Sequence, residues 1–354
     1  MDNFIYNSTC YFHKTTAGNI INQGRYQFFT NNSDFISLLD IAEFTQTSKS
    51  YDEILDFANK REISHDLIKK AIQKKVILID KDYKPRNNLV KRNKYFLDLL
   101  LDNPNNFNLE KEHIILVGCG GIGNFMSYPL SSLGIGEISL IDGDTIEESN
   151  LNRQFLFSRD DIGKNKVDTI GEKISKNDSE IIINKYCSKV TLSILNDILC
   201  NSKYKPSLII LSADDLYCLK LINIFATKNS IPFLNIGYLN DFSVIGPFYI
   251  PNVSSCAFCS DIGVSSSDEL DVELLNRIKL INGEFNTPAF FTNNAFAASM
   301  ALIDIIYYFS GEFSSINSLN KRIGIDNHDF TKHVLDTPLN KNCKFCGVNK
   351  NDWK

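Results

Sequence analysis

Near the start of the chain, apolar residues recur with helical spacing over three short stretches, and two short apolar runs flank them. The spacing predicts helices over residues 34–44, 50–59 and 64–75 and strands over 26–29 and 76–80. Asp34 is a candidate cap for the first helix, and Ser64 with Asp66 opens the third. Three short helices between strands indicate a small winged-helix-like module over residues 1–85.

From residue 113 onward the pattern changes to continuous apolar runs separated by helical stretches. The runs are HIILVG (113–118), EISLID (137–142), SLIILS (207–212) and residues 232–237, and the helical stretches are 123–133, 164–177 and 216–228. Continuous apolar strands crossed by helices predict an α/β domain with a mainly parallel sheet that is buried on both faces. We expect this domain to span 111–354, with a connecting helix in 86–110.

The N-terminal module has three possible roles. A peptide clamp would add an extended guest peptide at the edge of a sheet. A winged helix can also bind DNA, and residues 63–75 carry several lysines, although a solvated helix face explains these lysines equally well. A structural module that supports a dimer is the third possibility. The sequence favours the clamp.

Composition narrows the function classes. The chain has 354 residues, a formal net charge of -5 and an isoelectric point near 5.6, so it lacks the basic character typical of nucleic-acid or anionic-membrane binding. No run reaches the roughly 18 apolar residues of a membrane span, and the N-terminus does not resemble a secretory signal. We therefore expect a cytoplasmic protein with neither nucleic-acid nor membrane partners.

The first strand of the α/β domain is followed by a glycine-rich loop, Gly118-Cys-Gly-Gly-Ile-Gly123, with glycines at 118, 120, 121 and 123. Such a loop lets backbone N–H groups approach a phosphate at the start of a helix. We expect Gly118, Gly120, Gly121 and Gly123 to bind a nucleotide. The motif alone does not separate an adenylating enzyme from a dehydrogenase.

The segment after the second strand points to a triphosphate. Asp142 ends that strand, where a ribose-binding acid belongs, and Asp144 follows two residues later. Arg153 can bind phosphate oxygens in a forked manner and stabilise charge as pyrophosphate leaves, while Gln154 can bind the phosphates and Asn150 can orient its neighbours. Lys164 or Lys166 could reach the same phosphates, although either alone is typical of a surface.

An acidic pair, Asp214 and Asp215, follows the SLIILS strand. An acid at this end of a central parallel strand lies at the binding edge of the sheet, so Asp214 is predicted to hold Mg²⁺ beside the phosphates. Asp215 fits helix capping better. We assign catalytic roles to Arg153, Lys166 and Asp214.

Four of the nine cysteines form two Cys-x-x-Cys pairs, Cys256/Cys259 and Cys343/Cys346. Two such pairs predict a closed tetrahedral zinc site that ties the end of the chain to the domain, in preference to a redox motif or, in a reducing compartment, a disulfide framework. From Ser260 to Asn342 there is no cysteine, which disfavours a covalent thioester from that region.

In this order, the elements GCGGIG, LIDGD, NLNRQ, GKNKV, SADD and the paired cysteines resemble the ubiquitin-activating-enzyme-like (E1-like) superfamily, whose bacterial members include ThiF and MoeB. The resemblance covers about residues 110–350. Within the superfamily, the segments IEESNLNRQFLFSRDDIGKNK and NIGYLNDFSVIGPFYIP, together with the N-terminal module, resemble the adenylyltransferases of microcin C biosynthesis.

This resemblance implies a Rossmann-like adenylation domain in a homodimer that binds a short ribosomal precursor peptide ending in Asn. It implies that ATP, or another nucleoside triphosphate, activates the peptide carboxylate, that the adenylate closes to a succinimide, and that a second nucleotide is then attached through an N–P bond. By position, Asp142 would hold the ribose, and Arg153, Gln154 and Lys166 the phosphates. Asp214 would hold Mg²⁺, and the four cysteines Zn²⁺.

Three alternatives stay open. A ThiF- or MoeB-like enzyme would adenylate a ubiquitin-fold sulfur carrier, and the additional N-terminal module argues against it. A non-catalytic binding protein would not need Arg153, Lys166 and Asp214 together. An NAD dehydrogenase explains neither NLNRQ nor the cysteine pairs.

Overall fold

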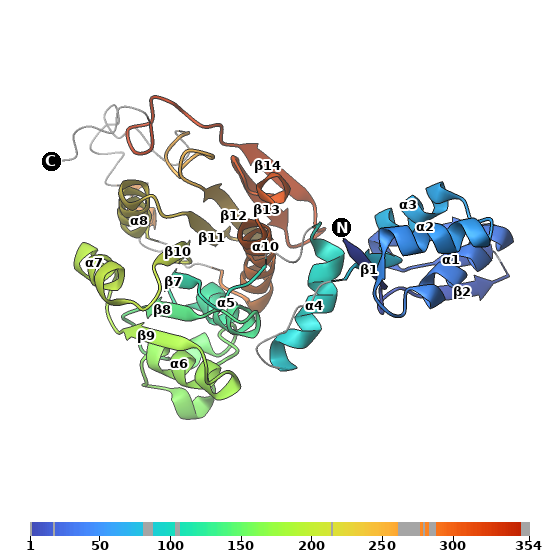
Figure 1. The fold of residues 1–354 in the computed structure, drawn as a ribbon. Helices are drawn as coiled ribbons and strands as arrows, with labels where there is room; N and C mark the ends of the chain where they lie inside the picture. Colours follow the sequence, from blue (N-terminus) through green and yellow to red (C-terminus); the bar gives the residue numbers. More distant parts are fainter. Residues whose placement is uncertain are drawn as a thin grey trace. The chain divides into compact units, whose positions relative to one another are not determined.

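The computed structural model of the chain describes residues 2–16, 18–80, 88–102, 107–213, 215–260, 277–278, 280–282 and 288–347, with side chains in the fourth helix from residue 92. The chain divides into two compact units, residues 1–105 and 106–354 (Figure 1). The helix expected to connect the domains is α4 (Asn88–Leu100), and it falls within the first unit.

The first unit holds the three predicted helices and two small sheets. Its other elements are β1 (Asn3–Tyr6), β2 (Phe12–Thr15), β3 (Gly18–Ile21), β4 (Phe28–Thr30), α1 (Asn32–Phe44), β5 (Lys49–Ser50), α2 (Tyr51–Lys60), α3 (His65–Gln73) and β6 (Ile77–Ile79). One antiparallel sheet has the order β5-β1-β6 and the other β2-β3-β4. The N-terminal strands β1 to β3 were not predicted.

Helix caps set the starts of these helices. Ser50 and Ser64 accept hydrogen bonds from the backbone N–H groups of Glu53 and Leu67, as N-cap residues do. The Asp34 cap is wrong, because Asn31 accepts the bond from the Asp34 N–H at 2.7 Å and α1 begins two residues earlier than predicted. The strand predicted at 26–29 is shifted, since a short 3-10 turn occupies Gly24–Tyr26.

The second unit is built on one large sheet. Its strands are β7 (His113–Val117), β8 (Glu137–Ile141), β9 (Ile182–Tyr186), β10 (Pro206–Leu211), β11 (Phe233–Leu239), β12 (Phe242–Tyr249), β13 (Lys321–Asp326) and β14 (Lys332–Asp336). Its helices of eight or more residues in the described ranges are α5 (Gly121–Ser132), α6 (Lys166–Asn177), α7 (Leu192–Asn201), α8 (Leu216–Asn229) and α10 (Phe291–Ser310).

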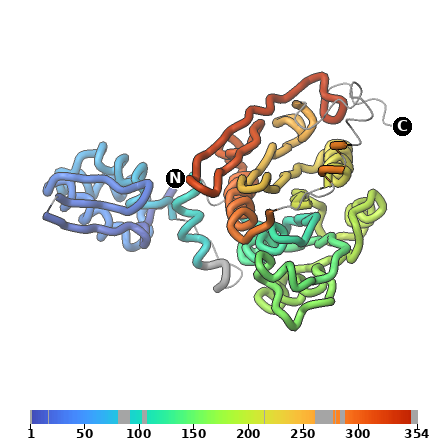
Figure 2. Tube along the Cα trace, turned by 180° about the vertical axis from the view of Figure 1, so that it is seen from behind, coloured from blue at the N-terminus to red at the C-terminus, as the bar shows by residue number. Residues whose placement is uncertain are grey.

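The sheet has the order β14-β13-β12-β11-β10-β7-β8-β9. Strands β9, β8, β7, β10 and β11 are parallel, which confirms the predicted α/β sheet, and β12 to β14 continue it as antiparallel strands. Seen from behind, the same order runs from green segments at one side of the unit to red segments at the other (Figure 2).

Helices cover both faces of the sheet. Helices α5, α6 and α10 pack on one face, while α7 and α8 pack on the other, over a core that includes Ile115, Leu211, Phe233 and Phe225 (Figure 1). The carboxyl ends of β7, β8, β10 and β11 therefore meet along one edge, where a ligand binds in sheets of this type. Among the described residues, no helix is long and apolar enough to cross a membrane.

Candidate active site

The glycine loop connects β7 to α5 and has a tight backbone. Gly118 adopts a φ of +90°, and its carbonyl accepts a hydrogen bond of 2.8 Å from the Ser212 hydroxyl at the end of β10. A Cβ on Gly123 would lie 1.9 Å from that same carbonyl oxygen, so this position admits only glycine. The packing places the first backbone N–H groups of α5 at the sheet edge, where they can bind an anion.

The acidic turn after β8 is held by the backbone. Asp142 accepts a hydrogen bond of 2.7 Å from the Cys119 N–H in the glycine loop and one of 2.8 Å from the Asp144 N–H. Each oxygen of a carboxylate has a further lone pair, so Asp142 can still accept a hydrogen bond from a ligand hydroxyl. The turn thereby fixes the position of Asp142 beside the loop.

Basic residues complete this side of the site. Lys166, the first residue of α6, is buried, and its Nζ lies 2.8 Å from an oxygen of the exposed Asp144. Arg153 donates from Nη1 to the Ser149 carbonyl and to the Asn152 side chain, at 3.1 and 2.9 Å. Lys164 does not line the cavity, and it pairs with Asp161 at 3.0 Å. Of the two lysines that the sequence offered as phosphate ligands, Lys166 is therefore the one placed in the site.

Two amide side chains in the same segment differ in role. The Asn150 oxygen accepts the Glu147 N–H at 3.2 Å and so holds the turn before Arg153, as expected for an orienting residue. Gln154 is 1% exposed, and its Oε1 has no hydrogen-bond partner among the described residues. A buried amide oxygen without a donor is costly, which suits a group that meets a bound ligand.

These residues line one cavity of about 860 Å³. Its lining includes eight predicted residues besides Arg153: Gly118, Gly120, Gly121, Asp142, Asp144, Asn150, Gln154 and Lys166. Gly123, which was also predicted to bind the nucleotide, does not line the cavity; its lack of a side chain allows the loop to pack closely. Asp214 lies outside the described residues, while Asp215 caps α8 by accepting the Tyr217 N–H at 2.9 Å.

The cavity also contains residues to which the sequence analysis assigned no role. Asn235 and Tyr238 come from β11, Arg322 from β13, and Asn294 from α10. Arg322 is partly buried, and its Nε has no hydrogen-bond partner among the described residues. Burial lowers the pKa of this guanidinium. The periodic pattern of β13 gave no signal that one of its residues faces a cavity.

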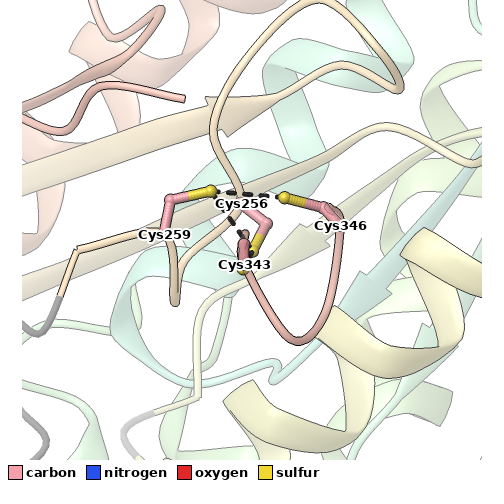
Figure 3. A group of neighbouring side chains, drawn as sticks. All are labelled: Cys256, Cys259, Cys343 and Cys346. Atoms are coloured by element: carbon pink, nitrogen blue, oxygen red, sulfur yellow. Dashed lines mark hydrogen bonds between the residues drawn. The ribbon is translucent and has the colours of Figure 1, made fainter. Parts of the chain in front are cut away.

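The four cysteines follow β12 and β14 in the sequence, and their side chains point toward one another (Figure 3). Their sulfur atoms all lie within 4.8 Å of one another, with separations of 3.6 Å for Cys256–Cys343, 3.9 Å for Cys256–Cys259 and 3.2 Å for Cys259–Cys346. Tetrahedral zinc with Zn–S bonds of about 2.3 Å needs sulfur atoms about 3.8 Å apart. The donor set and spacing therefore fit zinc.

A second hollow, of about 550 Å³, lies in the first unit. It is lined by the end of β1, by β6 and by Lys94, Tyr95 and Asp98 of α4. Strand β6 is at the edge of its sheet, and Lys94 and Asp98 form an ion pair of 2.6 Å. An edge strand beside a hollow can accept an extended peptide.

Comparison with known proteins gives a family match over most of the second unit and solved structures that match nearly the whole chain. The model of the ThiF family matches residues 96–346. A crystal structure of Escherichia coli MccB is similar with a TM-score of 0.84 and 29% identity, covering 99% of each chain. The microcin C7 biosynthetic enzyme MccB in complex with N-formylated MccA gives a TM-score of 0.83 and 30% identity, covering 98% of this chain and all of that one. Other structures of E. coli MccB contain ATP or succinimide.

A curated relative is the Nedd8-activating enzyme E1 catalytic subunit of Drosophila melanogaster, which is 48% identical over 58 residues, or 16% of this chain. The chain spans 13% of that subunit and less than two-fifths of the length of the first relatives that it matches. These curated matches cover less than half of this chain, whereas the MccB structures match the first unit as well.

Proposed function

The chain belongs to the ThiF family, as the resemblance in its sequence indicated, and we propose that it is an ATP-dependent adenylyltransferase of a short ribosomal peptide ending in Asn. One observation carries this proposal. The loop glycines, Asp142, Arg153, Gln154 and Lys166 line a single cavity large enough for a nucleotide and the end of a peptide. The likeness to MccB over both units supports the peptide as substrate.

In the first step, a carboxylate oxygen of the peptide attacks the α-phosphorus of ATP. The new P–O bond forms as the bond to pyrophosphate breaks, which gives an acyl-adenylate and free pyrophosphate. Lys166 and Arg153 stabilise the negative charge that builds on the phosphates, and the N-terminus of α5 adds its backbone N–H groups. Positioning and charge stabilisation suffice, so the enzyme needs no nucleophile of its own.

The next two steps take place on the peptide. The side-chain amide nitrogen of the terminal Asn attacks the activated carbonyl, which expels AMP and closes a succinimide. The imide nitrogen then attacks the α-phosphorus of a second ATP, forms the N–P bond and releases pyrophosphate. The stretch from Ser260 to Asn342 contains no cysteine, which agrees with a route without a thioester.

We assign the remaining parts as follows. Asp214 holds Mg²⁺, which offsets phosphate charge, and the four cysteines hold a structural Zn²⁺. The first unit clamps the peptide, and the hollow beside the free edge of β6 supports this role. The enzyme acts as a cytoplasmic homodimer.

The test is incubation of the full chain with Mg²⁺, a nucleoside triphosphate and each short Asn-terminated peptide found to be encoded near its gene. We expect pyrophosphate release and a peptide–nucleotide adduct in the mass spectrum, with ATP compared against CTP and other triphosphates. Arg153→Ala and Asp214→Ala should abolish transfer and retain the fold. Arg159→Ala is the matched control, because Arg159 is exposed and pairs with Glu148 outside the cavity.

Absence of any adduct with candidate peptides would reject the peptide as substrate. Normal turnover of Arg153→Ala or Asp214→Ala would show that the site is assigned wrongly.

A second candidate is adenylation of a ubiquitin-fold sulfur carrier. The curated relatives include adenylyltransferase and sulfurtransferase proteins, and this observation favours the second candidate. It predicts exchange of labelled pyrophosphate into ATP that depends on a carrier ending in Gly-Gly. Exchange with the carrier and none with the peptide would establish this candidate in place of the first.

A further inference from the structure

Three cations line the cavity within the described part of the chain, and they differ in their partners. Lys166 pairs with Asp144, and Arg153 donates to Ser149 and Asn152. Among the described residues, Arg322 has neither an ion pair nor a hydrogen-bond partner for its buried Nε. A partly buried cation whose Nε has no partner is costly to the fold, so the absent partner is expected to be a bound anion.

The sheet order places Arg322 of β13 and Asn235 of β11 on either side of β12. The pairs Ile236–Ile245 and Ile245–Ile323 are direct neighbours across β11, β12 and β13 and share one face of the sheet. Since side chains alternate along a strand, Asn235 and Arg322 point to the opposite face, and both line the cavity. The Asn235 amide also has no side-chain hydrogen bond among the described residues.

This pair lies away from the glycine loop. Along the sheet, β10, β11 and β12 separate β7 from β13, so the backbones of β7 and β13 are about 19 Å apart at about 4.8 Å per strand. An arginine side chain does not span that distance. A triphosphate held at the loop, Arg153 and Lys166 leaves Arg322 at the other end of the cavity.

We propose that Arg322, assisted by Asn235, is the subsite that binds the carboxylate of the acyl substrate and sets its approach to the nucleotide. The inference rests on the proposed adenylation and deepens it. A guanidinium can hold one carboxylate oxygen, or both until one is released to attack, and the Asn235 amide can donate to the same group. The subsite selects a free carboxylate over an amide.

The experiment compares wild type with Arg322→Gln and Arg322→Lys, using the peptide or carrier that supports pyrophosphate exchange. Each substrate is prepared with a free C-terminal carboxylate and as the C-terminal amide. We expect Arg322→Gln to raise the KM for the acid about 10–100-fold and leave ATP binding unchanged. Arg322→Lys should recover part of the loss, because it restores the charge without the fork.

Binding of the acid and the amide is measured by calorimetry with the same proteins. Wild type should prefer the acid, and Arg322→Gln should bind both alike. Lys321→Gln is the matched control, since Lys321 is the exposed neighbour on β13 and does not line the cavity. If Arg322 served only to stabilise the fold, Arg322→Gln would have a lower melting temperature than wild type. In the proposed role, the substitution removes a charge that lacks a partner in the protein, so the melting temperature should stay unchanged or rise.

Two results would overturn the inference while leaving the proposed function intact: an unchanged KM for the acid, or weaker ATP binding in Arg322→Gln with the preference for the acid retained. The second result would place a phosphate at Arg322. If wild type activates no peptide or carrier, the proposed function fails and the subsite fails with it.

Discussion

Replacing Cys343 by serine removes one of four sulfur atoms that lie within 4.8 Å of one another, and we expect it to release zinc and destabilise the second unit. Cys256, Cys259 and Cys343 belong to the core beneath α8, where Phe258 and Phe345 also stack with ring centroids 4.8 Å apart. Loss of the metal would therefore free two packed loops that are distant in sequence.

The size of the effect follows from ligand linkage. A metal present at a thousand times its dissociation constant stabilises the folded state by about 4 kcal/mol. The second unit is as large as domains in which 1 kcal/mol shifts the melting temperature by roughly 2–4 °C. Complete loss of zinc should therefore lower the melting temperature of this unit by about 8–16 °C.

The assay combines metal analysis by mass spectrometry with scanning calorimetry. Wild type should carry one zinc per chain, and Cys343→Ser should carry little and melt earlier. Cys187→Ser is the matched control, because Cys187 is exposed and outside the cluster. A Cys343→Ser protein with full zinc content and the melting temperature of wild type would refute the four-thiolate site.

Three further predictions concern single side chains. Lys166→Met should slow pyrophosphate exchange about 10²–10³-fold. Lys164→Met alters an exposed lysine outside the cavity and should retain activity. Equal losses in the two variants would contradict the assignment of Lys166 to the phosphates. Asp304→Ala should cost roughly 3 kcal/mol or more in urea unfolding, because the buried carboxylate accepts four hydrogen bonds of 2.6–3.0 Å from Asn317 and Ser318. Burial lowers the pKa of His113, so as the pH falls below about 6.5 only the unfolded chain takes up this proton. The free energy of unfolding, measured from pH 7 to 5, should therefore fall by up to about 1.4 kcal/mol per pH unit. The substitution His113→Gln should remove this dependence.

The sequence predicted best those parts of the site in which neighbouring residues act together. The glycine loop, the Asp142 turn and Arg153 lie close in sequence, and each follows a strand whose apolar run is unambiguous. Because parallel strands bring their carboxyl ends to one edge, the strand ends alone predict that these residues meet. The cysteine pairs were predictable for another reason, since metal chemistry limits the spacing within each pair.

Other parts depend on tertiary contacts that no local pattern encodes. Helix α10 is apolar over much of its length and carries Asn294, which comes to the cavity only because α10 packs on α5. The antiparallel strands β12 to β14 extend the sheet beyond its predicted parallel part, and with them Arg322 reaches the cavity. The start of α1 was missed because Asn31 and Asp34 are both good capping residues, and hydrogen-bond geometry decides between them.

The division of the cavity between strands has a consequence for substrate choice. The proposed nucleotide end of the cavity is lined by the loops after β7 and β8, whereas Asn235 and Arg322 come from β11 and β13. Those two strands are joined through β12 and share no hydrogen bonds with β7. If Arg322 and Asn235 bind the acyl substrate as proposed, we expect substitutions on β11 and β13 to change the acyl group that is accepted while the glycine loop keeps its geometry. Hence a double substitution of Lys166 and Arg322 should show nearly additive losses of ATP and acyl-substrate binding, because the two residues act on different ligands.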